Sequence, residues 1–288
     1  MTQHFKLPAT GALREAIGFD AVTHIHLYDS CGALADAALA SKRMESSADD
    51  WRGGLTATEA VRRCHAGDLA RVAPSDALLG RFERFGFVAP RRAWLNDVTG
   101  AIPDVPAYLA GHPLAMRRRT KITDTAAPLA IVADLSSSQG IKTSDLEKRG
   151  AAILALVRIM SARRPVELWA GCALDANGQN DASVILARID TAPLDLARAA
   201  FVMVGSSFPR HVCYALGRAL DGFGGGWPYG SHSISRTMMR DMIAPAFSHV
   251  SDMLCVPAAH MDDKIHKNPE AWIESRLADL EVKADEAA

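Results

Sequence analysis

The sequence predicts an α/β protein in which helices cover a sheet, and three consecutive segments lead to this prediction. Residues 127–134, "APLAIVAD", form a continuous apolar run of the kind found in strands that are buried on both faces. Residues 144–163 carry apolar side chains at helical spacing. A second apolar run, "PVELWAGCAL", follows them. A strand, a helix and a strand within about 45 residues have the size of a right-handed crossover with parallel strands.

The segments before residue 127 predict a mixture of strands, helices and connections. "AVTHIHLYD" alternates like a strand, and "GALADAALASKR" is typical of a helix. Thr56 and Glu59 have the spacing of a capping box, and Gly67 stands where a helix C-terminus favours glycine.

Two segments between residues 96 and 122 are predicted to lie at the surface. The segment 96–116 contains three prolines and two glycines, so we expect an extended connector. "MRRRTKI" then predicts a charged edge strand, because three adjacent arginines would alternate between the two faces of a strand.

The last third of the chain continues the alternation of strands and helices. "SVILARID" and "MLCVPAAH" predict strands, "FPRHVCYALGRALDGF" predicts a helix, and "NPEAWIESRLADLEVKADEAA" predicts a closing helix. Residues 193–204 fit a helix and a strand equally well, so both assignments stay open.

Composition limits the classes of function. The chain has 288 residues, of which 49% are hydrophobic, which is enough for a substantial core. A formal net charge of −1 gives no general attraction to nucleic acid or to an anionic membrane. The five cysteines show no C-x-x-C pair, and neither a signal peptide nor a membrane span is evident, so we expect a cytoplasmic protein.

The residues that end the apolar run at 127–134 predict a metal site. Asp134, Ser136 and Ser138 follow one another in a D-x-S-x-S pattern. The C-terminal end of a parallel strand is where α/β sheets bind ligands. A carboxylate and two hydroxyls are hard oxygen donors that suit Mg²⁺ or Mn²⁺. An open coordination position on such an ion would accept an acidic side chain of a partner.

This arrangement of strand, D-x-S-x-S, helix and strand resembles the von Willebrand factor A domain and its metal-ion-dependent adhesion site. The resemblance implies a three-layer, Rossmann-like domain over residues 120–288, with an α+β region over residues 1–119 packed against it. It assigns Asp134, Ser136 and Ser138 to the ion and matches Thr191 to the threonine of a second loop. It also implies a protein partner such as a ring-forming AAA ATPase.

The third loop of that family departs from the pattern in this chain. No Thr-Asp-Gly follows a fourth strand, although Asp262 or Asp263 would qualify if "MLCVPAAH" were the neighbouring strand. Without an aspartate in the third loop, the metal site would be degenerate.

A second resemblance, carried by residues 49–68, 96–119 and 268–277, is to an uncharacterised protein family of tailed phages and prophages. It implies a host cytoplasm and keeps open a structural or assembly role without a metal, with a phage structural protein as partner. It supplies no activity.

An enzyme is the third alternative. His24 and His26 lie two apart on a predicted strand, hence on one face, which is similar to the H-x-H of metal-dependent amidohydrolases. Such a hydrolase would need further ligands, drawn from His211, His260 and Asp262. No nucleotide-binding loop or nucleophile elbow is present, so the sequence favours a binding module over an enzyme and assigns no catalytic residue.

Overall fold

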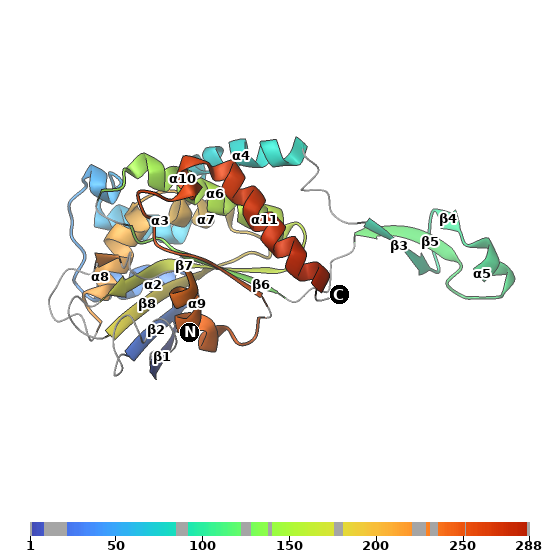
Figure 1. Ribbon diagram of the computed structural model, residues 1–288, viewed down its shortest axis with the longest axis horizontal. Coiled ribbons are helices and arrows are strands. Elements are labelled where there is room, and N and C mark those ends of the chain that lie inside the picture. The colour runs from blue at the N-terminus through green and yellow to red at the C-terminus, as the bar shows by residue number, and fades with distance from the viewer. Residues whose placement is uncertain are drawn as a thin grey trace.

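The computed structural model describes residues 2–8, 22–84, 92–121, 128–137, 140–175, 181–220, 229–230, 236–250 and 252–286. Its body is built on a mixed seven-stranded sheet, and a small three-stranded sheet lies apart from it (Figure 1). The strands of the large sheet are β1 (Thr2–Pro8), β2 (Val22–Tyr28), β6 (Leu129–Asp134), β7 (Val166–Asp175), β8 (Asp181–Ile189), β9 (Tyr229–Gly230) and β10 (Asp252–Val256).

The order of the large sheet is β1-β2-β8-β7-β6-β10, with β9 paired to one end of β7. The pairs β6–β7, β6–β10 and β2–β8 are parallel, whereas β1–β2, β7–β8 and β7–β9 are antiparallel. The predicted parallel neighbours β6 and β7 are therefore confirmed. The sheet as a whole is mixed, because β8 returns directly beside β7.

The helices of the body are α2 (Cys31–Ala40), α3 (Ala57–Ala66), α4 (Ala73–Arg84), α6 (Thr143–Ser161), α7 (Leu196–Met203), α8 (Tyr214–Gly217), α9 (Arg236–Ile243), α10 (Lys264–Lys267) and α11 (Pro269–Glu286). Short 3₁₀ turns are η1 (Asp50–Arg52), η2 (Leu69–Arg71) and η4 (Ala244–Phe247), and η3 (Phe208–Cys213) is a π-helical turn that runs into α8. Among the described helices, none has the length and apolar character needed to cross a membrane. The open assignment of residues 193–204 resolves mainly as helix α7.

The predicted helix caps are present in α3. The Thr56 side chain accepts a hydrogen bond from the Glu59 N–H, which begins the helix. Gly67 ends it with a φ of 77°. A side chain there would also strike the backbone of Ala197 in α7, at 2.4 Å from its carbonyl carbon, so glycine is needed for packing as well as for backbone conformation.

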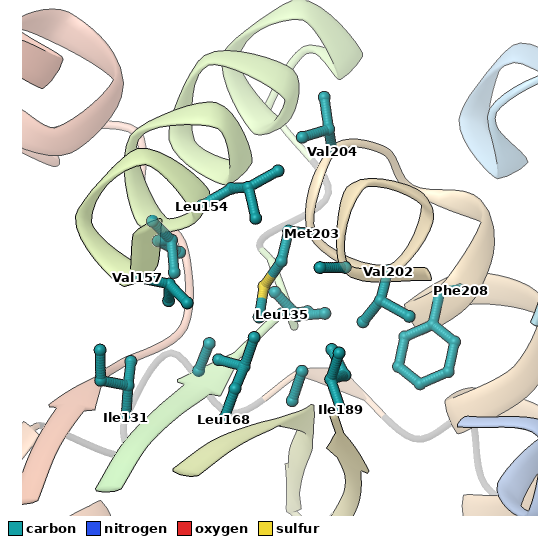
Figure 2. Packing of buried hydrophobic residues seen from close by; sticks show 14 of the residues in the cluster. Ile131, Leu135, Leu154, Val157, Leu168, Ile189, Val202, Met203, Val204 and Phe208 are labelled. Carbon is teal, nitrogen blue, oxygen red and sulfur yellow. The ribbon is translucent and has the colours of Figure 1, made fainter. Parts of the chain in front are cut away.

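The two faces of the large sheet are covered unequally. The larger apolar core lies on the face covered by α2, α3, α4, α6, α7 and α11. Figure 2 shows its centre, where Leu154 and Val157 of α6 meet Met203 of α7 above Ile131 and Leu168 of the strands. The opposite face packs against α9 and η4, through Met239, Met242, Ile243 and Phe247. Helices therefore flank the sheet on both faces, as the sequence predicts.

The division predicted at residues 119 and 120 does not coincide with a break in this sheet. Strand β2 pairs with β8 along seven register positions, and β1 extends the same edge. Tyr28, Cys31 and Leu34 belong to the same core as α6. The N-terminal strands therefore complete the body and do not form a separate layer against it.

The part that stands apart is residues 92–121, which we call the arm (Figure 1). It contains β3 (Arg92–Asp97), β4 (Ile102–Pro103), α5 (Val105–Leu109) and β5 (Met116–Lys121), in the sheet order β3-β5-β4. The strand predicted at 116–122 is present as β5, but its predicted position at an edge is wrong, because β5 is paired on both sides. The predicted extended connector is also wrong: Asp104 caps α5, with Pro106 in its first turn.

Candidate functional site

Asp134 ends β6 at the C-terminal edge of the sheet, between β7 and β10. Its Oδ1 accepts hydrogen bonds from the N–H groups of Ser136 (2.9 Å) and Ala173 (3.2 Å). Asp134 and Ser136 have no exposed surface. The apolar run before Asp134 fixes this position, since all six residues of β6 are buried and Asp134 is the last of them.

Two oxygen atoms at this position have no hydrogen-bond partner among the described residues, Asp134 Oδ2 and Ser136 Oγ. The Ser136 hydroxyl lies beside the carboxylate and lowers its pKa. A buried polar atom left without a partner costs about 1–3 kcal/mol, so such atoms call for an explanation, for example an ion or a catalytic role. A carboxylate oxygen and a hydroxyl oxygen side by side fit Mg²⁺ or Mn²⁺.

Arg149 of α6 is the positive charge nearest to this carboxylate in the described structure. Its guanidinium is buried and donates from Nη2 to the backbone oxygens of Asp134 (2.9 Å) and Pro257 (2.5 Å). It therefore joins the loop after β6 to the loop after β10. Because Arg149 already brings positive charge to Asp134, it weakens the attraction of the carboxylate for a cation.

Burial raises the pKa of Asp134, and the neighbouring groups oppose this effect. The Ser136 side chain and N–H, the Ala173 N–H and the charge of Arg149 all lower it. A divalent ion would add to these groups and favour the ionised carboxylate.

The loop after β10 lies beside the loop after β6. Strand β10 is the parallel neighbour of β6, and the Ala259 N–H donates to the Ser136 carbonyl at 2.8 Å. The strand in "MLCVPAAH" is thus the neighbour of the strand that ends at Asp134, which is the condition for assigning Asp262 or Asp263 to the third loop. Asp263 accepts from the His260 N–H and lies within electrostatic range of Arg149, whereas Asp262 is exposed and pairs with Lys267.

The structure does not bring Thr191 to Asp134. Thr191 follows β8, which runs antiparallel to β7, so it lies at the N-terminal end of β7 and donates to the Val166 carbonyl. Asp134 is in register with Gly171, five residues further along β7, which corresponds to about 17 Å. The fourth predicted ligand, Ser138, lies outside the described residues.

A different buried hydroxyl is that of Ser206, close to Gly53 of the segment before α3. It lies in the loop between α7 and η3, is fully buried and has no hydrogen-bond partner among the described residues. Arg210, four residues later, donates from Nη2 to Ser137 Oγ at 3.1 Å, which ties this loop region to the loop after β6. Ser206 is therefore a buried hydroxyl on a loop whose neighbour Arg210 contacts the loop after β6, and the sequence did not indicate it.

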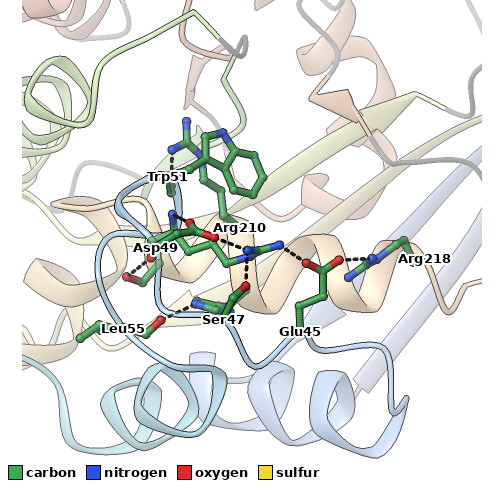
Figure 3. A network of polar contacts seen from close by, with 10 residues as sticks. Glu45, Ser47, Asp49, Trp51, Leu55, Arg210 and Arg218 are labelled. Carbon is green, nitrogen blue, oxygen red and sulfur yellow. Dashed lines mark hydrogen bonds and ion pairs between the residues drawn. The ribbon is translucent and has the colours of Figure 1, made fainter.

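Residues 43–55, which we call the covering segment, are bound to η3 and α8 beside this edge (Figure 3). Arg210 donates to the Trp51 carbonyl and stacks on its ring, with 4.5 Å between the guanidinium carbon and the ring centroid. Ser207 Oγ donates to the Arg52 carbonyl at 2.7 Å. The same Arg210 thus contacts both the covering segment and Ser137.

An ion-pair network holds the covering segment in shape (Figure 3). Arg52 pairs with Glu45 and Asp49 and donates to Ser47, and Arg218 of the body pairs with Glu45 at 2.7 Å. Since the Arg52 side chain is only 10% exposed, these contacts are better shielded from solvent than ordinary surface pairs.

The histidines proposed for a hydrolase lie at different places. His24 and His26 share one face of β2, as predicted, and His4 of β1 joins them with its Nδ1 at 2.5 Å from that of His26. His211 is bonded to the Leu55 carbonyl, and His260 lies in the loop after β10. These two are therefore not placed as further ligands of a site at His24 and His26.

A family model described as "Domain of unknown function (DUF7192)" matches residues 15–276. The chain belongs to this family. No curated protein and no solved structure matches it significantly. The family description carries neither a von Willebrand A nor a phage assignment.

Within the described residues of this DUF7192 chain, no group of three or more His, Cys, Asp and Glu side chains is arranged to hold a metal ion. A cation at Asp134 would therefore depend on hydroxyl and water oxygens, in keeping with the preference of Mg²⁺ for retaining several waters.

Sequence reasoning missed Arg149, Arg210 and Ser206. One signal for Arg149 is its spacing, because it stands three residues after Leu146 and four before Ile153, on the apolar stripe of α6. An arginine on such a stripe must find partners in the interior. No comparable pattern marks Arg210 or Ser206, which depend on how η3 packs.

Proposed function

We propose that this protein is a partner-binding module that holds Mg²⁺ or Mn²⁺ at the Asp134 edge of its sheet. The observation that carries the proposal is the pair of buried oxygens without hydrogen-bond partners, Asp134 Oδ2 and Ser136 Oγ. Their chemistry is that of a hard cation site, and their position at the end of a central parallel strand is where α/β sheets bind ligands.

Each residue of the proposed site has a separate role. Asp134 supplies negative charge, and Ser136 and Ser138 supply neutral oxygens. Ser206 is proposed in place of Thr191 as the hydroxyl of a second loop. Asp263, in the third loop, stays bound to the His260 N–H near Arg149 and does not ligate the ion. With one buried carboxylate, the ion keeps net positive charge, which an acidic side chain of the partner would meet.

The strand order β8-β7-β6-β10 supports the likeness to a von Willebrand A domain, because the central strand β6 has a parallel neighbour on each side: β7, reached through helix α6, and β10. The partner that this likeness implies is a ring-forming AAA ATPase. Since Asp134 and Ser136 are fully buried, a partner carboxylate reaches the ion only when neighbouring chain moves. The covering segment is the part of the neighbourhood that would move: ion pairs and hydrogen bonds hold much of it, and only Met44, Trp51 and Leu55 in it pack against the rim of the apolar core.

The test is metal-dependent thermal stability of the full chain, followed by calorimetry with MgCl₂ and MnCl₂. A ligand that binds only the folded state stabilises it by roughly 2.7 kcal/mol at a hundredfold excess over its Kd, which raises the Tm measurably. We expect Asp134→Asn to abolish the increase, and Ser136→Ala and Ser206→Ala to reduce it.

Two variants serve as controls. Asp252→Asn changes an aspartate at the opposite end of the sheet, and Ser75→Ala removes a buried hydroxyl that is bonded to the Val72 carbonyl. Both should keep the metal response. A wild type that shows neither a Tm shift nor heat of binding with either ion would refute the metal site and leave Arg149 as the counter-charge of Asp134 among the described residues.

A phage assembly role without a metal is the second candidate. The observation that favours it is the arm, which exposes large apolar side chains away from the body (Figure 1). Retention of partner binding in Asp134→Asn would favour this candidate over the first.

A further inference from the structure

The arm exposes an unusual share of the apolar surface of the chain. Nine large hydrophobic residues are exposed in the described structure, and six of them lie between residues 98 and 114. These six, which we call the arm patch, are Val98 (65% exposed), Ile102 (46%), Val105 (56%), Tyr108 (72%), Leu109 (78%) and Leu114 (39%). Clusters of this kind on a soluble protein mark an interaction surface.

The arm does not use this patch for a core of its own. None of the hydrophobic clusters among the described residues includes a residue of the arm. Its order comes instead from strand pairing and from polar contacts, such as the Asp104 cap on α5 and the pairs Arg117–Asp104 and Arg118–Asp97. A small three-stranded sheet whose described apolar side chains are exposed gains stability when another surface covers them.

The charge of the arm indicates which kind of surface would dock on the arm patch. The arm contains five basic residues and two acidic residues, a net charge of +3, whereas the whole chain carries −1. The rest of the chain therefore carries −4. Contact between two arms is opposed by their like charge, and contact between an arm and the body of another copy is favoured.

We infer that the arm patch docks on the body of a second copy of this chain. The contact joins two different surfaces, so it closes either as a reciprocal pair or as a ring. An anionic lipid surface is the alternative occupant for an arm of this charge, and the test below distinguishes it from a second copy. The inference uses no residue of the Asp134 edge and is independent of the metal proposal.

The test is light scattering coupled to size exclusion on the full chain, over a range of concentrations at low and high salt. The wild type should form a defined oligomer that weakens as salt rises, since screening reduces the attraction of opposite charges. The double variant Tyr108→Ser/Leu109→Ser should associate at least about tenfold more weakly, as expected when central apolar anchors are removed. His112→Ser, on the same exposed turn of the arm, should associate like the wild type.

The double variant must also unfold in urea like the wild type, because its two side chains belong to no core cluster. A protein that is monomeric under all conditions, or an oligomer that the double variant leaves intact, would overturn the inference. Binding of the wild type to vesicles of anionic phospholipid without self-association would also overturn it, and would assign the patch to a membrane surface.

Discussion

The Asp134 edge of the body and the tip of the arm violate the usual distribution of polar and apolar groups in opposite ways. At the edge, Asp134, Ser136 and Arg149 are buried. At the tip, Tyr108 and Leu109 are almost fully exposed. Both arrangements cost free energy in the isolated chain, and the surrounding fold maintains both.

The two regions lack different kinds of contact: hydrogen-bond partners at the edge and apolar contacts on the arm. The edge has polar atoms without partners inside a complete core, which indicates a small ligand such as an ion. The arm exposes six large apolar side chains that belong to no core cluster of the described residues, which indicates a large interaction surface. The comparison predicts that substitutions in the body affect folding, whereas equivalent substitutions in the arm affect only association.

The largest effect is expected for Gly150→Ala in α6. An added Cβ would lie 1.8 Å from the Met203 carbonyl oxygen, a backbone atom that cannot rotate away. We expect a loss of about 4 kcal/mol in the free energy of unfolding, measured by urea denaturation. Gly80→Ala in α4 is the matched control: its Cβ meets nothing within 4 Å, so it should stabilise the helix by about 0.5–1 kcal/mol. Equal effects of the two changes would show that α6 and α7 do not approach as described.

A pair of leucines compares the two regions directly. Leu154 is 0% exposed at the centre of the core, and Leu109 is 78% exposed on the arm. Leu154→Ala should cost about 3 kcal/mol of unfolding free energy, and Leu109→Ala should stay within about 0.5 kcal/mol of the wild type. Dilute protein in urea is the appropriate measurement, because association would otherwise add to the stability. A large cost for Leu109→Ala in the monomer would mean that the arm packs on its own body.

The smallest effect is a pH dependence from His26. Burial, with the neighbouring His4 and His24, lowers the pKa of His26 from 6.5 to about 4. Because the folded-state pKa is depressed, the stabilisation is present above pH 6.5 and is lost as the pH falls toward 4. After allowance for partial exposure, His26 should contribute about 2 kcal/mol to the acid destabilisation between pH 7 and 4.5.

His26→Gln should remove that contribution, whereas the exposed arm variant His112→Gln should lose stability with pH as the wild type does. The measurement is urea unfolding at both pH values. If His26→Gln retained the full pH dependence, the titrating group would lie elsewhere.

The sequence predicted the local elements best where several signals agreed. The apolar run before Asp134 and the stripe of α6 predicted a strand and a helix, and both are present. The capping box at Thr56 also lies where it was predicted. By contrast, the prolines at 103 and 106 are compatible with either a connector or the start of a short helix, and only the pairing of β4 and β5 decides between them.

The candidate site was predicted in part, for a similar reason. Asp134 and Ser136 are fixed by their position directly after one strand, so a sequence pattern suffices to find them. Thr191 was misplaced because its location depends on the direction of β8, and apolar strands of either direction have similar sequences. Arg149 and Arg210 reach the loop after β6 from other elements, which no local pattern encodes.

The sequence by itself determined the class of the protein and the chemistry available to it: an α/β chain with a carboxylate and hydroxyls at the end of a buried strand, and a proline-containing segment beside a run of arginines. Only the tertiary structure decided that the N-terminal strands complete the sheet, that Thr191 lies at its far edge and that residues 92–121 form an arm. The physical reason is how far apart in the sequence the interacting residues lie. Helix caps and apolar periodicity arise from neighbours along the chain, whereas strand direction and the meeting of loops depend on contacts between residues far apart in the sequence.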